Sequence, residues 1–263
     1  QRNRERGKRG DAVKKKYLAV SILIFLAAAV CAGVGIRQYL KEKNAGDGYS
    51  ALRAEVGTGV PKEKPEDSGV EIPIDFAALQ SKNPDIYAWI TIPGTAVDYP
   101  IVQSETDNTY YLTHTIDGEV SPEGSIYTET YNSRDFEDPN TVIYGHDMAN
   151  GSMFQNLLKY QDRSFFDANR EVLVYTPDAI RHYRIFAAYL YDDRHLMQSF
   201  DFDDKEIYRQ YLDSVFSIRE MGACIDTGQA VTDEDKIITL STCYGNQADR
   251  RYLVQAVLIS IEQ

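Results

Sequence analysis

The sequence predicts a mainly β domain, a closed β-barrel with peripheral helices, preceded by one transmembrane helix. After residue 70 the chain consists largely of short runs of β-branched and aromatic residues separated by Gly, Pro, Asn and Asp. Only a few stretches carry the three- to four-residue apolar spacing of a helix. Near the N-terminus, residues 17–36 contain no charged side chain. These three observations favour a β-barrel with peripheral helices that follows a membrane-spanning segment in the chain.

The first 36 residues have the features of a membrane anchor. Residues 1–16 carry eight Lys and Arg against Glu5 and Asp11, a net charge of +6. The apolar run 17–36 follows, and at about 1.5 Å per residue it spans about 30 Å, the thickness of a bilayer core. The positive-inside rule predicts a single-pass protein of the cell membrane, with 1–16 cytoplasmic and the remaining chain extracellular. A cleaved signal peptide is the alternative, although this run exceeds the usual 7–15 residues of a signal core.

The rest of the chain is acidic. The whole chain has a net charge of −12, so the part beyond residue 16 carries −12 − 6 = −18. Nucleic acids bind basic surfaces, so no nucleic-acid partner is expected. Residues 37–69 are polar and rich in Gly, Pro and charge, which predicts an extracellular linker. The folded domain is expected over 70–263.

The predicted elements of this domain follow from turn and capping signals. Asp75 is a good N-cap for a short helix over 76–82, which Asn83-Pro84 ends. Strands are predicted at 86–92, 98–103, 124–129, 140–145, 171–176, 180–191, 237–243 and 250–259. Helical segments are predicted at 107–114, at 152–160 with Ser152 as cap, and at 203–220.

Cys243 stands at the end of one predicted strand, and Arg250 and Arg251 open the next. A thiol beside a fixed cation is a plausible nucleophile with an anion stabiliser. Because a strand alternates faces, only one of the two arginines is expected to face the thiol. Of the other cysteines, Cys31 lies in the predicted anchor and Cys224 in the domain. A Cys224–Cys243 disulfide is the structural alternative for an extracellular pair.

The candidate base is His146, which ends an apolar strand and follows Gly145, where the backbone can turn sharply. The other histidines, His114, His182 and His195, are assigned surface or packing roles. The sequence holds no metal-binding cluster of Cys and His, and no phosphate-binding glycine loop. No cofactor or metal is therefore expected.

Three segments together resemble the sortases, and specifically their class B. They are residues 140–154 (NTVIYGHDMANGSMF), residues 239–243 (TLSTC) with a following Arg at a strand start, and residues 75–102 (DFAALQSKNPDIYAWITIPGTAVDYPIV). The resemblance covers about residue 70 to the C-terminus. It implies an eight-stranded sortase-type barrel and a cysteine transpeptidase. Such enzymes cleave a C-terminal sorting signal of secreted proteins, often Asn-Pro-x-Thr in class B, and join the new end to an amine, usually of peptidoglycan.

The resemblance also assigns residues. The family's nucleophile falls on Cys243, its histidine on His146 and its arginine on Arg251. Arg251 matches because an aromatic residue and then two aliphatic residues follow it. The matching substrate-contact positions are Asn108, Leu112, Tyr144 and Ser241. Packing is the alternative role for Leu112 and Tyr144.

Three other functions stay open at this stage. A pilin-polymerising sortase would use a lysine amine as acceptor. A cysteine peptidase or wall hydrolase would release an acid and gain nothing from an added amine. An anchored scaffold or adhesion domain would carry a structural Cys224–Cys243 bridge and no activity.

Overall fold

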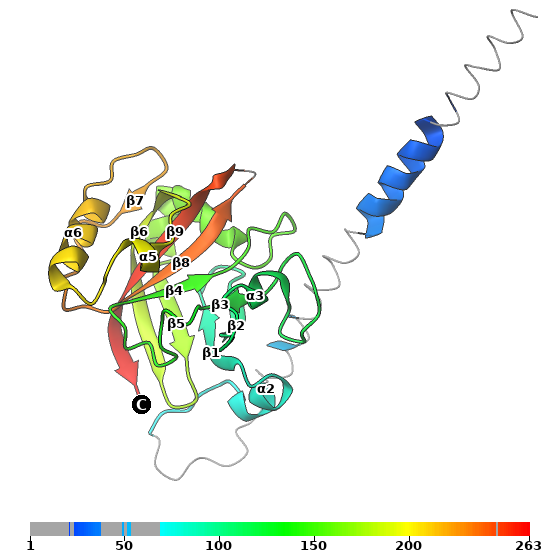
Figure 1. Cartoon of the computed structure of the whole chain (residues 1–263). Helices are drawn as coiled ribbons and strands as arrows, with labels where there is room; N and C mark the ends of the chain where they lie inside the picture. Colours follow the sequence, from blue (N-terminus) through cyan, green and yellow to red (C-terminus); the bar gives the residue numbers. More distant parts are fainter. Residues whose placement is uncertain (1–20, 22–23, 38–48, 50–51, 54–68, 246) are drawn as a thin grey trace, which may run out of the picture. The chain divides into compact units, whose positions relative to one another are not determined.

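The computed structural model describes residues 21, 24–37, 49, 52, 53, 69–245 and 247–263 (Figure 1). Two units form, residues 1–45 and 46–263. In the first unit residues 24–37 are helical, and large apolar side chains such as Ile24, Phe25 and Val30 are exposed. Among the described residues, no helix has the length and apolar character needed to cross a membrane. The predicted span 17–36 includes 17–20, 22 and 23, which lie outside the described residues, so the anchor stays a prediction.

The second unit is built on a closed barrel. Its strands are β1 (Ile86–Thr91), β2 (Asp98–Val102), β3 (Ile126–Tyr127), β4 (Asn140–Tyr144), β5 (Glu171–Tyr175), β6 (Ile180–Asp192), β7 (Cys224–Ile225), β8 (Ile237–Tyr244) and β9 (Gln247–Glu262). They pair in the order β5-β1-β2-β3-β4-β8-β9-β6, and β6 pairs with β5 to close the ring. The predicted closed eight-stranded barrel is therefore confirmed. The short β7 is an additional strand on β6 that the sequence analysis did not predict.

Both faces of the last barrel strands are buried, which explains their nearly continuous apolar sequence. In β9 the side chains of Tyr252 and Val254 join the main core, whereas Leu253 joins a second cluster on the other face. That second cluster contains the buried face of helix α6 (Lys205–Phe216), which packs outside the barrel (Figure 1). Alternating side chains of one strand thus contribute to two apolar layers.

Two of the predicted helices are capped by aspartates. The Asp75 carboxylate accepts a hydrogen bond from the Ala78 N–H at 2.9 Å and begins α2 (Phe76–Lys82), as predicted. The Asp204 carboxylate accepts from the N–H groups of Glu206 and Ile207 and begins α6. The helix predicted over 203–220 is therefore shorter at both ends.

The helix predicted over 152–160 is wrong in type and start. Residues Gln155–Gln161 form a 3₁₀ helix, η1, and the Ser152 side chain does not cap it. The physical reason is Met153, whose φ of 55° is left-handed and whose backbone bridges to Asp147. An α-helix cannot run through such a residue. The remaining short helices are α3 (Tyr110–Thr113), α4 (Arg163–Ala168) and α5 (Leu196–Ser199), of which α4 and α5 were not predicted.

Part of the stretch predicted as a linker packs on the barrel. Tyr49 and Leu52 are helical and buried in the main core, and the Tyr49 ring meets Tyr99 edge-on at 5.2 Å. The Arg53 guanidinium donates to the Asp98 carbonyl at 2.7 Å. These described residues extend the packed unit upstream of residue 70.

Candidate active site

One edge of the barrel brings Cys243 and His146 together. Strands β4 and β8 are parallel, with Tyr144 opposite Ser241. Parallel strands in register end at the same edge of a sheet. His146 follows Tyr144 by two positions and Cys243 follows Ser241 by two, so the two side chains arrive at the same level. A hydrogen bond joins the imidazole and the thiol.

Gly145 allows the chain to pass from β4 to His146, but not by the sharp turn predicted. Its φ is not in the left-handed region. A Cβ there would lie 2.5 Å from Ile126 Cδ1 and 2.8 Å from the Phe154 ring. Close packing, not backbone conformation, requires the glycine. The Phe154 N–H donates to the His146 carbonyl at 2.9 Å, which fastens the following loop.

The hydrogen bonds of His146 define its chemistry. Its Nε2 lies 2.8 Å from the Leu112 carbonyl oxygen, which can only accept, so Nε2 carries a proton. Nδ1 is then the nitrogen available to the thiol. The hydrogen bond to Cys243, together with the bond to Leu112, raises the pKa of His146 against the effect of burial. An imidazole oriented in this way can accept and return a proton at Cys243.

The same contact activates the thiol. The hydrogen bond from His146 lowers the pKa of Cys243, and the charge of Arg251 lowers it further, while burial opposes both. Cys243 and His146 are both half-buried. The pair thus favours a thiolate beside an imidazolium.

The strand register selects Arg251 over Arg250. Arg251 lies directly opposite Cys243 on β9, and residues opposite one another across an antiparallel pair share a face. Its guanidinium donates to the carbonyls of Ala248 and Arg250 at 3.0 and 2.9 Å, and it lines the cavity that holds Cys243. Arg250 lies opposite Asp192 of β6 and is absent from that lining.

The cavity has a volume of about 210 Å³. Of the predicted substrate-contact residues, Leu112, Tyr144 and Ser241 line it beside Cys243, His146 and Arg251. Asn108 does not line it. The Asn108 carboxamide oxygen instead accepts a hydrogen bond from the Thr130 N–H at 2.9 Å and supports the segment after β3.

His195 also lines this cavity, besides packing against the Tyr131 ring. It comes from the segment after β6, together with Asp193 and Arg194. Its Nε2 lies 2.5 Å from Glu129 Oε2 and 3.4 Å from the Tyr144 hydroxyl. No sequence signal linked these residues, because Glu129 and His195 are 66 positions apart.

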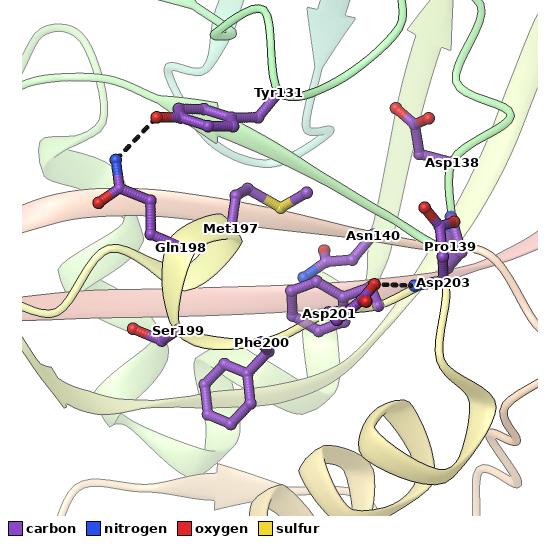
Figure 2. A pocket seen from close by; sticks show the side chains of 11 residues that line it. Tyr131, Asp138, Pro139, Asn140, Met197, Gln198, Ser199, Phe200, Asp201 and Asp203 are labelled. Carbon is purple, nitrogen blue, oxygen red and sulfur yellow. Dashed lines mark hydrogen bonds between the residues drawn. The ribbon is translucent and has the colours of Figure 1, made fainter.

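A second cavity of about 330 Å³ is lined in part by α5 (Figure 2). Its walls include Met197, Gln198 and Ser199 of α5 and the carboxylates of Asp138, Asp201 and Asp203. Across the described part of the chain, no group of three or more His, Cys, Asp or Glu side chains is arranged to hold a metal ion. The residues that line this cavity include neither a cysteine nor a histidine.

The disulfide alternative does not hold for the folded domain. Cys224 and Cys243 are both free thiols. Cys224 is buried, and that burial raises its pKa, so it is the less reactive of the two. The structural bridge that a scaffold function required is therefore missing.

Comparisons with known proteins agree with this geometry. A family model described as the sortase domain matches residues 90–259. A sortase B of Listeria monocytogenes is 35% identical over 179 residues, 66% of this chain and 68% of that protein. A sortase B of Staphylococcus aureus is 26% identical over 250 residues, 94% of this chain and 98% of that protein.

Solved structures give the same result. Sortase B of Bacillus anthracis matches with a TM-score of 0.70 and 29% identity, covering 84% of this chain and 99% of that one. Sortase B of Clostridium perfringens matches with a TM-score of 0.64 and 32% identity, covering 71% of this chain and all of that one. With a matching family model over most of the chain, and a thiol and an imidazole in contact at one barrel edge, the chain belongs to the sortase family of cysteine transpeptidases, in its class B.

Proposed function

We propose that this sortase cleaves an Asn-Pro-x-Thr type signal near the C-terminus of secreted proteins and transfers them to an amine of cell-wall peptidoglycan. The observation that carries the proposal is the hydrogen-bonded Cys243–His146 pair with Arg251 on the same face. The resemblance to class B sortases supplies the substrate class. No cofactor takes part in the proposed reaction.

In the proposed first step, Cys243 is the nucleophile. Its thiolate attacks the carbonyl carbon of the signal's Thr, and the carbonyl oxygen becomes a tetrahedral oxyanion. Arg251 stays protonated, so it stabilises that oxyanion or positions the peptide. The C–N bond then breaks, His146 gives a proton to the leaving amine, and a thioester remains on Cys243.

In the second step the acceptor amine attacks the thioester. His146 takes the proton of the incoming amine, the new amide bond forms, and the Cys243 thiolate leaves. Proton transfer of this kind typically contributes about 10²–10⁴-fold to the rate. The proposed peptide contacts are Leu112, Tyr144 and Ser241 on the cavity wall. Asn108 lies outside this wall and supports the segment after β3, so it is not proposed as a direct peptide contact.

The enzyme is proposed to act outside the cell, held by a single-pass anchor over 17–36 with residues 1–16 in the cytoplasm. The uncharged run behind a basic block supports this orientation. Further support comes from the helical residues 24–37, whose apolar side chains are exposed; Phe25, for example, is 80% exposed. A helix with such a surface is stable only when lipid or protein covers it. Protease protection of the N-terminal segment in sealed membrane vesicles would test this orientation.

Mass spectrometry of residues 46–263, the unit that includes the buried Tyr49 and Leu52, tests the chemistry. The domain is mixed with an Asn-Pro-x-Thr peptide in the absence of an amine. An adduct of the N-terminal peptide fragment on Cys243, absent in Cys243→Ala, is expected. Cleavage that persists in Cys243→Ala would remove this residue as the nucleophile.

The acceptor is tested by adding amines to the same reaction. A wall-peptide amine should convert the thioester to an amide faster than water does. Faster transfer to a pilin lysine would identify a pilin-polymerising enzyme. Equal rates with and without any amine would identify a hydrolase.

A further inference from the structure

Two walls of the catalytic cavity come from distant segments and meet at one histidine. Tyr144 stands on β4, and His195 follows β6. The Glu129 carboxylate lies 2.5 Å from His195 Nε2, and the Tyr144 hydroxyl lies 3.4 Å from the same nitrogen. Glu129 itself is absent from the cavity lining. Glu129 therefore affects the cavity through the residues that line it, not by contacting a bound molecule.

Burial makes the contact between Glu129 and His195 strong. The side chains of Glu129 and His195 are 13% and 26% exposed. A carboxylate with little contact to water must have its charge satisfied by protein donors. The His195 N–H supplies such a donor. Charge-assisted hydrogen bonds of this kind are roughly twice as strong as neutral ones.

The same two chain segments meet at a second place. Tyr131 follows Glu129 by two positions and lies over the His195 ring at a centroid distance of 5.1 Å. Its hydroxyl accepts a hydrogen bond from the Gln198 carboxamide at 2.8 Å (Figure 2). The segment after β3 thus contacts the segment 193–199 twice. Glu129 contacts His195, which lines the catalytic cavity, and Tyr131 contacts Gln198, which lines the second cavity.

We propose that Glu129 is a positioning residue of this enzyme, which fixes Tyr144 and His195 as the wall against which the signal peptide binds. Loss of its carboxylate would release His195, the side chain that the Tyr144 hydroxyl contacts. The Cys243–His146 pair would be unaffected, because its contacts are to Leu112 and Arg251. The inference rests on the proposed function for its substrate, but not for its geometry.

The test compares Glu129→Gln, His195→Gln and their double variant with the wild-type enzyme. Gln keeps the size of Glu129 but removes the negative charge that His195 contacts. We expect KM for the Asn-Pro-x-Thr peptide to rise about tenfold in Glu129→Gln, as loss of a charge-assisted hydrogen bond predicts. The kcat and the rate of Cys243 alkylation by iodoacetamide should stay within about twofold. The double variant should be no worse than the poorer single one, because both changes remove the same contact.

Tyr131→Phe is the matched control. It keeps the ring on His195 and removes only the bond to Gln198, in a side chain that is 47% exposed. Its KM should stay within about twofold of wild type, as expected for an exposed hydrogen bond. A purely structural role of Glu129 would lower the melting temperature and the titratable thiol without raising KM. That result would overturn the proposal.

A second readout does not depend on the signal. The ratio of Cys243 alkylation rates with a bulky maleimide and with iodoacetamide reports the shape of the cavity wall. We expect this ratio to change about threefold or more in Glu129→Gln, in line with a wall displaced by a lost contact, and to stay constant in Tyr131→Phe. If the wild-type enzyme does not cleave the Asn-Pro-x-Thr peptide but the alkylation ratio changes in Glu129→Gln, the proposed signal is wrong and the positioning role stands. An unchanged ratio in Glu129→Gln refutes the positioning role.

Discussion

Replacing Gly145 by Ala should damage both the barrel edge and the active site. The new Cβ would lie 2.5 Å from Ile126 Cδ1 and 2.8 Å from the Phe154 ring, so restoring ordinary contact at 3.4 Å requires shifts of 0.9 and 0.6 Å. Neither neighbour can swing into solvent, since Ile126 is 1% and Phe154 0% exposed. Overpacking of a filled core costs about 1–3 kcal/mol. For a domain of this size that lowers the melting temperature by about 2–12 °C.

The same substitution should slow turnover, because the Phe154 N–H holds the His146 carbonyl. A misplacement of about 1 Å in an active site can cost roughly 100-fold in rate. Thermal unfolding and peptide cleavage by the unit 46–263 measure the two effects. Gly228→Ala is the control, because its Cβ would have only the Asp226 carboxylate within reach, at 3.3 Å. If Gly145→Ala melts and turns over like Gly228→Ala, close packing does not hold the His146 loop.

Three more predictions concern the site. The rate of Cys243 alkylation should rise with pH at a lower midpoint than for an ordinary cysteine. The reason is that the hydrogen bond from His146, and then the charge of Arg251, lowers the pKa of Cys243. His146→Ala should therefore raise the midpoint more than Arg251→Ala, and a midpoint common to all three proteins would contradict this. Leu112→Ala should raise KM for the signal peptide more than Asn108→Ala does, because only Leu112 lines the cavity. Asn108→Ala should cost no more than about 1 kcal/mol of unfolding free energy, because water can solvate the exposed Thr130 N–H. Equal KM values in the two variants would refute the distinction. Iodoacetamide should label the native unit 46–263 once, at Cys243. It should label buried Cys224 only after denaturation, as peptide mapping would reveal.

Local patterns were sufficient to predict most of the barrel. Asp75 capped its helix as expected, and the strands around Tyr144 and Cys243 end where apolar sequence gives way to polar turns. These features depend on neighbours in the sequence, which is why composition and spacing predict them. The two-residue β7 has too little sequence to carry a pattern.

Long-range contacts account for what the sequence did not predict. The left-handed Met153 depends on a backbone bridge to Asp147, which no helical spacing indicates. The choice between Arg250 and Arg251 depends on the β8–β9 register, which is irregular between Cys243 and Tyr244. His195 resembled an ordinary loop histidine because its partner Glu129 belongs to a segment far upstream.

The parallel pairing of β4 with β8 has a consequence for how the enzyme becomes reactive. The hydrogen bond from Thr239 Oγ1 to Asn140 Oδ1, 2.8 Å long, joins residues 99 positions apart. Pairings of such high contact order form late, after shorter loops have closed. Before this pairing forms, Cys243 lacks His146, although Arg251 can already face it across the neighbouring β8–β9 hairpin. A cysteine without such an imidazole is mostly protonated at neutral pH. A copy still folding, or one that has lost its barrel, therefore carries a thiol of lower reactivity than the folded enzyme. The Cys243 thiol becomes fully reactive only when the barrel has closed, and it loses this reactivity when the barrel opens.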